Sequence, residues 1–166
     1  PISLRGETHQ GFSDDSSWAR GQSWAVYGLA LCYHYTHEEA ILPLFERVTK
    51  YFIDHLPEDY VPYWDLIFSD GSCEPRDTSA AAIAACGILE MEKYYHNQEF
   101  LDIAKKMMSS LSEKYTTVDY LQSNGIIKDG MYSRKHGHKS ECTSWGDYFY
   151  LEALMRMKKS DWKIYW

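Results

Sequence analysis

The chain has 166 residues, enough for one domain with a sizeable core, and we expect a single domain over residues 1–166. Its formal net charge of −7 argues against a nucleic-acid-binding surface, and no apolar stretch approaches the roughly 20 residues that a membrane span needs. Aromatic residues make up 16% of the chain, which suits a large core and also a partly hydrated sugar-binding cleft.

Apolar residues at helical spacing predict five helices. Their expected ranges are 17–35, 39–56, 78–95, 98–114 and 144–158. The first, third and fifth are apolar on nearly every side, as buried helices are, whereas the second and fourth each carry one apolar stripe. This alternation predicts an all-α fold of tandem αα-hairpins, each with one inner and one outer helix.

The three buried helices begin alike, with Asp and hydroxyl residues at 15–17, 77–79 and 143–144. Such side chains accept hydrogen bonds from the free N–H groups of a first helical turn, so we expect them, Asp15 among them, to act as N-caps. Ser144 followed by Asp147 also fits a capping box.

Long loops at 57–77 and 116–142 lead from each outer helix to the next inner one, whereas the reverse connections are short. The second loop contains Asn124-Gly125 and Asp129-Gly130, which predict a short β-hairpin. Both loops feed the N-termini of inner helices, which carry partial positive charge. We therefore expect a cleft at this end that favours an anionic ligand.

Aromatic side chains in these loops leave two interpretations open. Tyr60, Tyr63, Trp64 and Asp65 fit sugar contact and a hydrophobic plug beneath the loop equally well. Trp145 fits either helix packing or the lining of the cleft.

Cysteine and histidine spacing gives no strong metal signal. The four cysteines are widely separated and form no CxxC pair, so we expect reduced thiols. His136, His138 and Cys142 lack a fourth ligand at a suitable spacing, and a solvated basic loop is the preferred interpretation.

Three stretches carry a family resemblance: HQGFSDDSSWARGQSWAVYGLALCYHYT at 9–36, RDTSAAAIAACGILEM at 76–91 and ECTSWGDYFYLEALMR at 141–156. All three resemble the unsaturated glucuronyl hydrolases, glycoside hydrolase family 88. Related unsaturated rhamnogalacturonyl hydrolases more often have Asn where this chain has Gln22, so the glucuronyl group is favoured and the rhamnogalacturonyl group is the alternative.

The resemblance implies an (α/α)6 toroid, of which this chain would form about half, as a C-terminal portion. It also implies an enzyme that hydrates the C4=C5 bond of a Δ4,5-unsaturated uronic acid at the end of lyase-generated oligosaccharides, so that the acid is released. No metal or organic cofactor is implied. The implied partners are such oligosaccharides, of glycosaminoglycan or similar type, and either the missing N-terminal half or further copies of this chain.

The same resemblance assigns substrate binding to His9, Gln10, Arg20 and Trp24. Arg20 would pair with the uronate carboxylate and Trp24 would offer its face to the sugar ring. Asp14 and Asp15 are adjacent carboxylates that point in different directions, so we assign neither a catalytic role. The acid/base Asp of the family is expected upstream of Pro1, which leaves no catalytic residue in this chain.

The loop before the last inner helix departs from some relatives, which have S-x-x-S-x-K and meet a sulfate there. Here Ser133 is kept, but His136 and His138 stand at the other two positions, so sulfate recognition is in doubt. A non-catalytic helical-repeat module that binds acidic sugars or protein is a further alternative. The chain begins at Pro1 without a signal peptide, so bacterial cytoplasm and periplasm both stay open.

Overall fold

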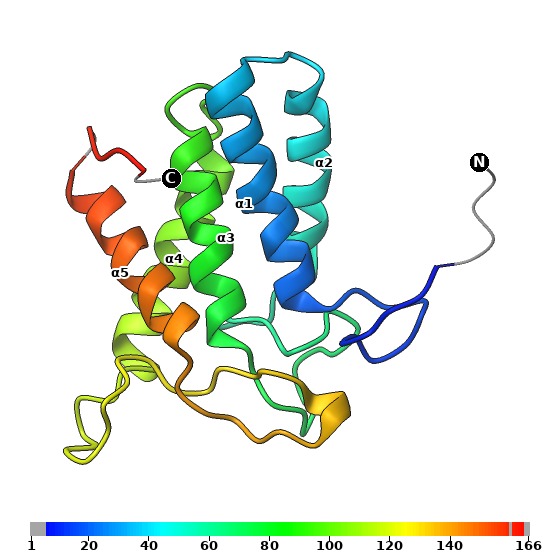
Figure 1. Ribbon diagram of the computed structural model, residues 1–166, viewed down its shortest axis with the longest axis vertical. Helices are drawn as coiled ribbons and strands as arrows, with labels where there is room; N and C mark the ends of the chain where they lie inside the picture. The colour runs from blue at the N-terminus through cyan, green and yellow to red at the C-terminus, as the bar shows by residue number, and fades with distance from the viewer. Residues whose placement is uncertain (1–5, 160, 165–166) are drawn as a thin grey trace.

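The computed structural model describes residues 6–159 and 161–164, which form helices joined by loops (Figure 1). The helices are α1 (Ala19–Thr36), α2 (Ile41–Asp54), α3 (Thr78–Met91), α4 (Gln98–Lys114) and α5 (Ser144–Lys158), with a short 3-10 helix η1 at Arg134–His136. All five predicted helices are present, and the ranges expected for α4 and α5 are confirmed to the residue. The ends of the expected single domain, residues 1–5 and 165–166, lie outside the described residues.

The helices form an inner row and an outer row. In Figure 1, α1, α3 and α5 lie side by side with α3 in the middle, while α2 packs against α1 and α4 against α3. Every residue of α3 except Leu89 is buried, whereas α2 buries only Phe45, Thr49 and Phe52. The packing order confirms the predicted inner and outer rows, and α3, which has helices on both sides and behind it, buries nearly its whole surface.

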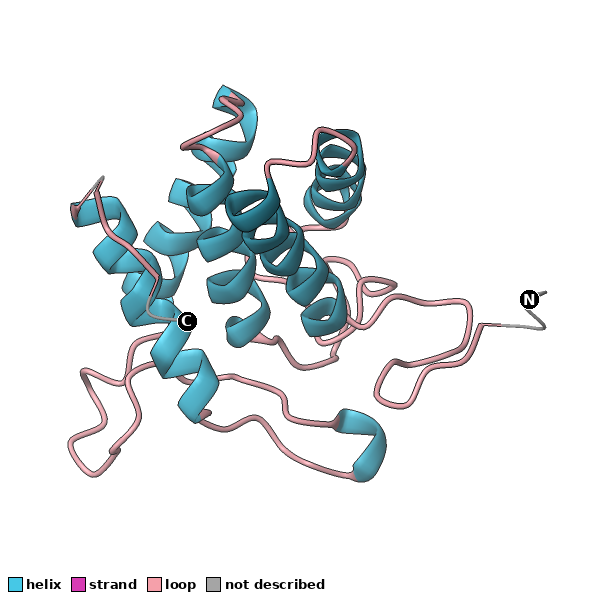
Figure 2. Cartoon of the chain, turned by 45° about the horizontal axis from the view of Figure 1, so that its top comes forward, coloured by secondary structure: helices cyan, strands magenta, loops and turns pink. Residues whose placement is uncertain are grey.

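The three inner helices all begin at the same end of the molecule, and the long loops gather there (Figures 1 and 2). Backbone hydrogen bonds join these loops: Leu66 N–H donates to the Ser17 carbonyl, and Thr78 N–H donates to the Asp129 carbonyl. The loop end is thus one connected layer beneath three helix N-termini.

The predicted β-hairpin around residues 124–130 is wrong. Within the described ranges the loop forms isolated antiparallel bridges, Thr116 with Ile127 and Gly130 with Glu141, and no strand. The physical reason is Asp147 of α5, whose carboxylate accepts hydrogen bonds from the N–H groups of Ile126 and Ile127 at 2.9 and 3.0 Å. A side chain thereby takes donors that a strand partner would need.

The capping bonds expected of Asp15 and Asp77 and the capping box of Ser144 are not made, whereas Thr143 caps α5 as expected. The N-cap of α1 is Trp18, without a side-chain capping bond, and Asp15 is exposed three residues earlier. At α5 the cap is Thr143, whose hydroxyl accepts from Gly146 N–H. The capping box expected of Ser144 does not form, because Asp147 is held by the loop.

The four cysteines are free thiols, as expected. Among the helices of the described chain, none is both long and apolar enough to cross a bilayer.

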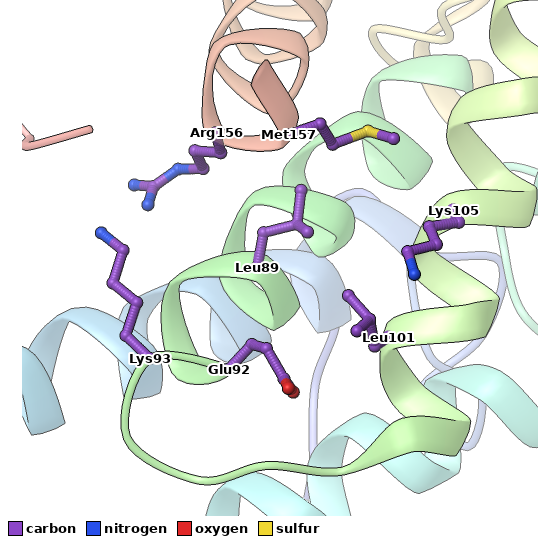
Figure 3. Close-up of a pocket in the computed structure, with 7 residues that line it drawn as sticks. All are labelled: Leu89, Glu92, Lys93, Leu101, Lys105, Arg156 and Met157. Atoms are coloured by element: carbon purple, nitrogen blue, oxygen red, sulfur yellow. The ribbon is translucent and has the colours of Figure 1, made fainter. Parts of the chain in front are cut away.

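The inner row ends at α5, which leaves apolar side chains exposed to solvent. These are Tyr148, Leu151, Leu154 and Met157. A cavity of about 430 Å³ lies beside them, at the end of the helices opposite the long loops. Leu89 of α3, Leu101 of α4 and Met157 of α5 line it, with Lys93 and Lys105 among its polar residues (Figure 3).

Candidate functional site

A shallow pocket of about 170 Å³ opens at the loop end of the inner helices. Its lining residues are Gln10, Trp18, Arg20, Trp24, Tyr132 and Trp145. The structure thus brings together three of the four residues expected to bind substrate. The fourth, His9, is absent from the lining and contacts the ring of His136, with 5.0 Å between the ring centroids.

The centre of this site is built from equivalent positions of the three hairpins. Arg20, Ser79 and Trp145 are each the second residue of an inner helix, namely of α1, α3 and α5. Because the three helices start at the same end, these side chains converge. The shared helix starts at 15–17, 77–79 and 143–144 do not reveal this equivalence, because α1 begins at Ala19 rather than at residue 17.

Arg20 is almost fully buried, and protein groups surround its guanidinium. Nη1 donates to Asp77 Oδ2 at 2.9 Å and to the Met131 carbonyl at 2.8 Å, while Nη2 donates to the Tyr132 carbonyl at 2.6 Å. Burial lowers the pKa of Arg20, and the negative charge of Asp77 opposes this shift. Arg20 therefore holds the loop at 131–132 as well as lining the pocket.

Two indole rings flank the guanidinium of Arg20. Its Cζ lies 4.7 Å from the ring centroid of Trp18 and 5.2 Å from that of Trp145. Such cation–π contacts gain strength where water is excluded. The positive guanidinium of Arg20 therefore lies between two aromatic rings. This arrangement suits a ligand that combines an apolar ring face with a negative charge.

Asp77 is the main residue of the site that the sequence did not indicate. It occupies the N-cap position of α3 without making a capping bond, and its side chain is completely buried. Burial raises the pKa of Asp77, while the charge of Arg20 and the hydrogen bond from Ser79 act in the opposite direction. Its sequence context, an Asp before a helix, is equally typical of a cap, and its partner Arg20 lies 57 residues away.

The aromatic wall of the pocket comes from α1, α5 and the loop between α4 and α5. Trp24 is 37% exposed and packs edge-on against Phe149, with centroids 5.1 Å apart. Tyr132 lies against Trp145, which is thereby placed in the lining rather than in helix packing alone. Gln10 Nε2 donates to the Tyr132 carbonyl at 3.3 Å and joins the first loop to the last.

The basic loop beside the pocket is held by its own histidine and by neighbouring loops. The Ser133 hydroxyl and His136 Nδ1 lie 2.6 Å apart, and the ring of His138 packs edge-on against Tyr132. Lys135 Nζ donates to the Thr8 carbonyl. In the part of the chain that the structure describes, no three His, Cys, Asp or Glu side chains gather closely enough to hold a metal ion.

The aromatic loop at 60–65 is absent from the lining of this pocket, although Trp64 lines a separate hollow with Glu74 and Arg134. Tyr63, Trp64 and Asp65 are buried, and Trp64 Nε1 donates to Glu74 at 2.9 Å. Asp65 accepts from Phe12 N–H and from the Ser16 hydroxyl, each at 2.8 Å. This buried carboxylate therefore fixes the segment that carries Gln10.

These features define a class: an all-α protein of tandem αα-hairpins with an aromatic, arginine-containing pocket at the N-termini of the inner helices. The model of Glycosyl Hydrolase Family 88 matches residues 4–160. The chain belongs to this family, as its motifs indicated.

Relatives agree in sequence and in structure. An unsaturated chondroitin disaccharide hydrolase of Streptococcus pneumoniae is 48% identical over 169 residues, which cover 98% of this chain and 42% of the relative. The crystal structure of an unsaturated glucuronyl hydrolase from Streptococcus agalactiae has a TM-score of 0.92 at 46% identity, covering 98% of this chain and 42% of that one. An unsaturated glucuronyl hydrolase specific for heparin has a TM-score of 0.84 at 30% identity. The chain thus matches less than half the length of these α/α-toroid relatives, and the predicted fold class is confirmed.

Proposed function

We propose that the protein containing these residues releases Δ4,5-unsaturated uronic acid from the non-reducing end of lyase-generated oligosaccharides. One observation carries the proposal. Gln10, Arg20 and Trp24 line the same pocket as Tyr132, which lies 122 residues after Gln10 in the sequence. The most informative relative is the Streptococcus agalactiae enzyme solved in complex with dGlcA-GalNAc6S, an unsaturated uronyl disaccharide. We infer the same substrate class, an unsaturated disaccharide of glycosaminoglycan type.

The reaction requires the addition of water across C4=C5. The hydroxyl joins C5 and the proton joins C4, and the resulting hemiketal at C5 opens with release of the adjoining sugar. The family's acid/base Asp is expected upstream of Pro1, so the residues of this chain would bind and orient the uronate rather than transfer the proton.

Trp24 and Arg20 have direct places in this scheme, and Gln10 supports the Tyr132 loop. Trp24, Tyr132 and Trp145 offer apolar faces to the C–H groups of a sugar ring. Arg20 supplies positive charge in the pocket, and a guanidinium has five N–H donors, so it can bind its protein partners and still meet a carboxylate. His9 contacts the basic loop, which makes it a candidate for contact with the second sugar.

The test measures hydration directly. The conjugated double bond of an unsaturated disaccharide absorbs in the ultraviolet, and hydration removes that absorbance. Full-length protein should abolish it, and Trp24→Ala should lower kcat/KM at least about tenfold, which corresponds to ~1.4 kcal/mol of lost transition-state stabilisation. Leu121→Ala, at a side chain that is 97% exposed, is the control and should retain full activity.

The other outcomes distinguish the alternatives. Loss of absorbance only with unsaturated rhamnogalacturonan fragments would reassign the protein to the related hydrolases. Calorimetric binding of the disaccharide with no loss of absorbance would identify a non-catalytic sugar-binding module.

A further inference from the structure

We propose that Asp77 is a positioning residue of the pocket, which acts through Arg20 and Ser79 to fix the Tyr132 loop and the indole of Trp145. The inference rests on the proposed function for its kinetic consequence, but the anchoring itself is independent of substrate. Asp77 is absent from the lining of the pocket. Its effect on binding must therefore pass through the residues that it holds.

Asp77 lies at a junction of the loop layer. Its backbone N–H donates to the Pro62 carbonyl at 2.9 Å, and the next residue, Thr78, is tied through its N–H and hydroxyl to the carbonyls of Asp129 and Lys128. Both long loops therefore meet at the start of α3. A carboxylate at this point can act on both of them.

Both oxygens of the carboxylate are used. Oδ2 accepts from Arg20 Nη1 at 2.9 Å. Oδ1 accepts from the Ser79 hydroxyl at 2.5 Å and from Met131 N–H at 3.4 Å. Asp77 thus contacts the loop at Met131 directly and also through Arg20, whose Nη1 bonds the carbonyl of the same residue.

Ser79 carries the effect to Trp145. A serine hydroxyl has a single hydrogen, and an ionised carboxylate only accepts, so that hydrogen goes to Asp77. The Ser79 oxygen must then act as an acceptor, and it accepts from Trp145 Nε1 and from Arg20 Nη1, each at 3.2 Å. The charge of Asp77 thereby sets the direction of the hydrogen bonds that orient the indole.

Arg20, the other residue that Asp77 holds, fixes Tyr132. Its carbonyl accepts from Arg20 Nη2 at 2.6 Å and from Gln10 Nε2 at 3.3 Å. Its ring lies against that of Trp145, with 5.7 Å between centroids. Two walls of the pocket, one from the loop and one from α5, therefore depend on a single buried ion pair.

The test compares two variants of the full-length protein with a matched control. Asp77→Asn keeps the shape and removes the charge, and Ser79→Ala removes only the hydroxyl. The control is Asp59→Asn, which removes a carboxylate that also pairs with an arginine, Arg76, and with the hydroxyl of Tyr115, at a site away from the pocket. Thermal unfolding of each variant verifies that it is folded.

The steady-state kinetics of hydration of the unsaturated disaccharide give the first readout. We expect KM to rise at least about fivefold in Asp77→Asn and about threefold in Ser79→Ala, with kcat changed less than about twofold, because preformed walls bind ground state and transition state alike. Asp59→Asn should leave both constants unchanged. The double variant of Ser79→Ala and Trp145→Phe should be non-additive, since each change alone breaks the same hydrogen bond.

Amide hydrogen exchange of residues 130–139 gives the second readout and needs no activity. Exchange should accelerate at least about fivefold in both test variants and remain unchanged in Asp59→Asn. If the wild-type protein does not hydrate the disaccharide, the proposed function is wrong. The exchange rates would still test whether Asp77 anchors the loop. Folded variants with wild-type exchange and KM, or equal effects in the control, would overturn the role of Asp77. If Asp77→Asn does not fold, Ser79→Ala decides in the same way.

Discussion

Glu90 is completely buried near the C-terminal end of α3, where an isolated carboxylate would be strongly destabilising. Two cations compensate its charge. Arg156 of α5 donates to Oε2, and Lys93 Nζ lies 2.8 Å from the same oxygen. Burial alone would raise the pKa of Glu90, but the hydrogen bonds and charges of Lys93 and Arg156 outweigh burial and lower it.

This shift predicts a pH-dependent stability. Because the pKa of Glu90 in the folded state lies below the ordinary value of 4.5, its ion pairs contribute fully above that value and are lost as the pH falls through the folded pKa. Glu90→Gln should lower the free energy of unfolding near neutral pH by about 3 kcal/mol, as removal of one partner of a buried pair does. It should also flatten the fall of Tm as the pH drops below the ordinary value of 4.5.

Thermal unfolding across this pH range measures both effects. Asp54→Asn is the control, because the Lys50–Asp54 pair is half exposed and should contribute little. A variant whose Tm falls with pH as steeply as the wild type would show that Glu90 is not the group that titrates.

The family resemblance indicated most of the site residues that lie within one motif. Gln10, Arg20 and Trp24 lie within one motif, and the structure places all three at the pocket. Asp77 was missed because its role depends on a partner in another helix, and an Asp before a helix is also an ordinary cap. Tyr132 was missed because its position is set by contacts of its backbone carbonyl, which the side-chain pattern does not record.

At the scale of the elements, α1 and α3 approach very closely. A Cβ on Gly87 of α3 would lie 2.8 Å from the backbone Cα and N of Tyr27, whereas a Cβ on Gly28 of α1 would meet nothing within 4 Å. The alanines of α3 serve the same purpose, since small side chains let helix backbones come together. Glycine at 87 is therefore a packing requirement rather than a source of flexibility.

The two glycines make a matched pair. Gly87→Ala should destabilise the protein by about 1–3 kcal/mol through overpacking against the backbone of α1. Gly28→Ala should stabilise it by about 0.5–1 kcal/mol, because alanine restricts the unfolded chain and favours the helix. Urea unfolding of both variants checks this, and equal effects of the two changes would contradict the close approach.

Helix ends were predictable where apolar residues kept their helical spacing up to the last turn of the helix. α4 and α5 match their expected ranges, whereas α3 ends at Met91, four residues before the expected end, in turns that the period alone does not reveal. The β-hairpin was wrong because Asp147, a residue of the following helix, takes the backbone donors of the loop. Turn residues indicate where a chain can reverse, but not what its N–H groups will bind.

At the scale of the whole molecule, the exposed face of α5 is the clearest sign of a surface that other chain segments can cover. Leu151 is 47% exposed and Met157 is 45% exposed, in a helix that otherwise resembles the buried ones. The S. pneumoniae relative is more than twice as long as the matched region. We therefore expect this face to be covered in the full-length protein.

A chain of these 166 residues alone should consequently self-associate, because exposed apolar patches drive association. Light scattering should detect oligomers, and the double change of Leu151→Gln and Leu154→Gln should shift them toward monomer. Changing Lys158, a charged residue on the same helix, to Gln should have no such effect. A monodisperse wild-type monomer that unfolds cooperatively would contradict this prediction.

The overall architecture was predictable because two independent signals agreed. Alternating burial indicated hairpins, and the motif resemblance placed them in a toroid. Sequence could not show which aspartates are buried: Asp14 and Asp15 are exposed, whereas Asp65 and Asp77 are buried and serve as anchors. The roles of acidic residues in this chain are set by burial, which is a property of the fold.

Arg20 holds the Tyr132 loop by main-chain carbonyls, and this choice of atoms matters for how the protein can change. Every residue type supplies the same carbonyl, so the anchor is indifferent to which side chains follow at 133–139. Substitutions at 133–139 can remove side-chain contacts such as that of Lys135 with the Thr8 carbonyl, but they leave the carbonyls that Arg20 binds. We therefore expect this segment to vary in sequence while its anchor to α1 stays intact.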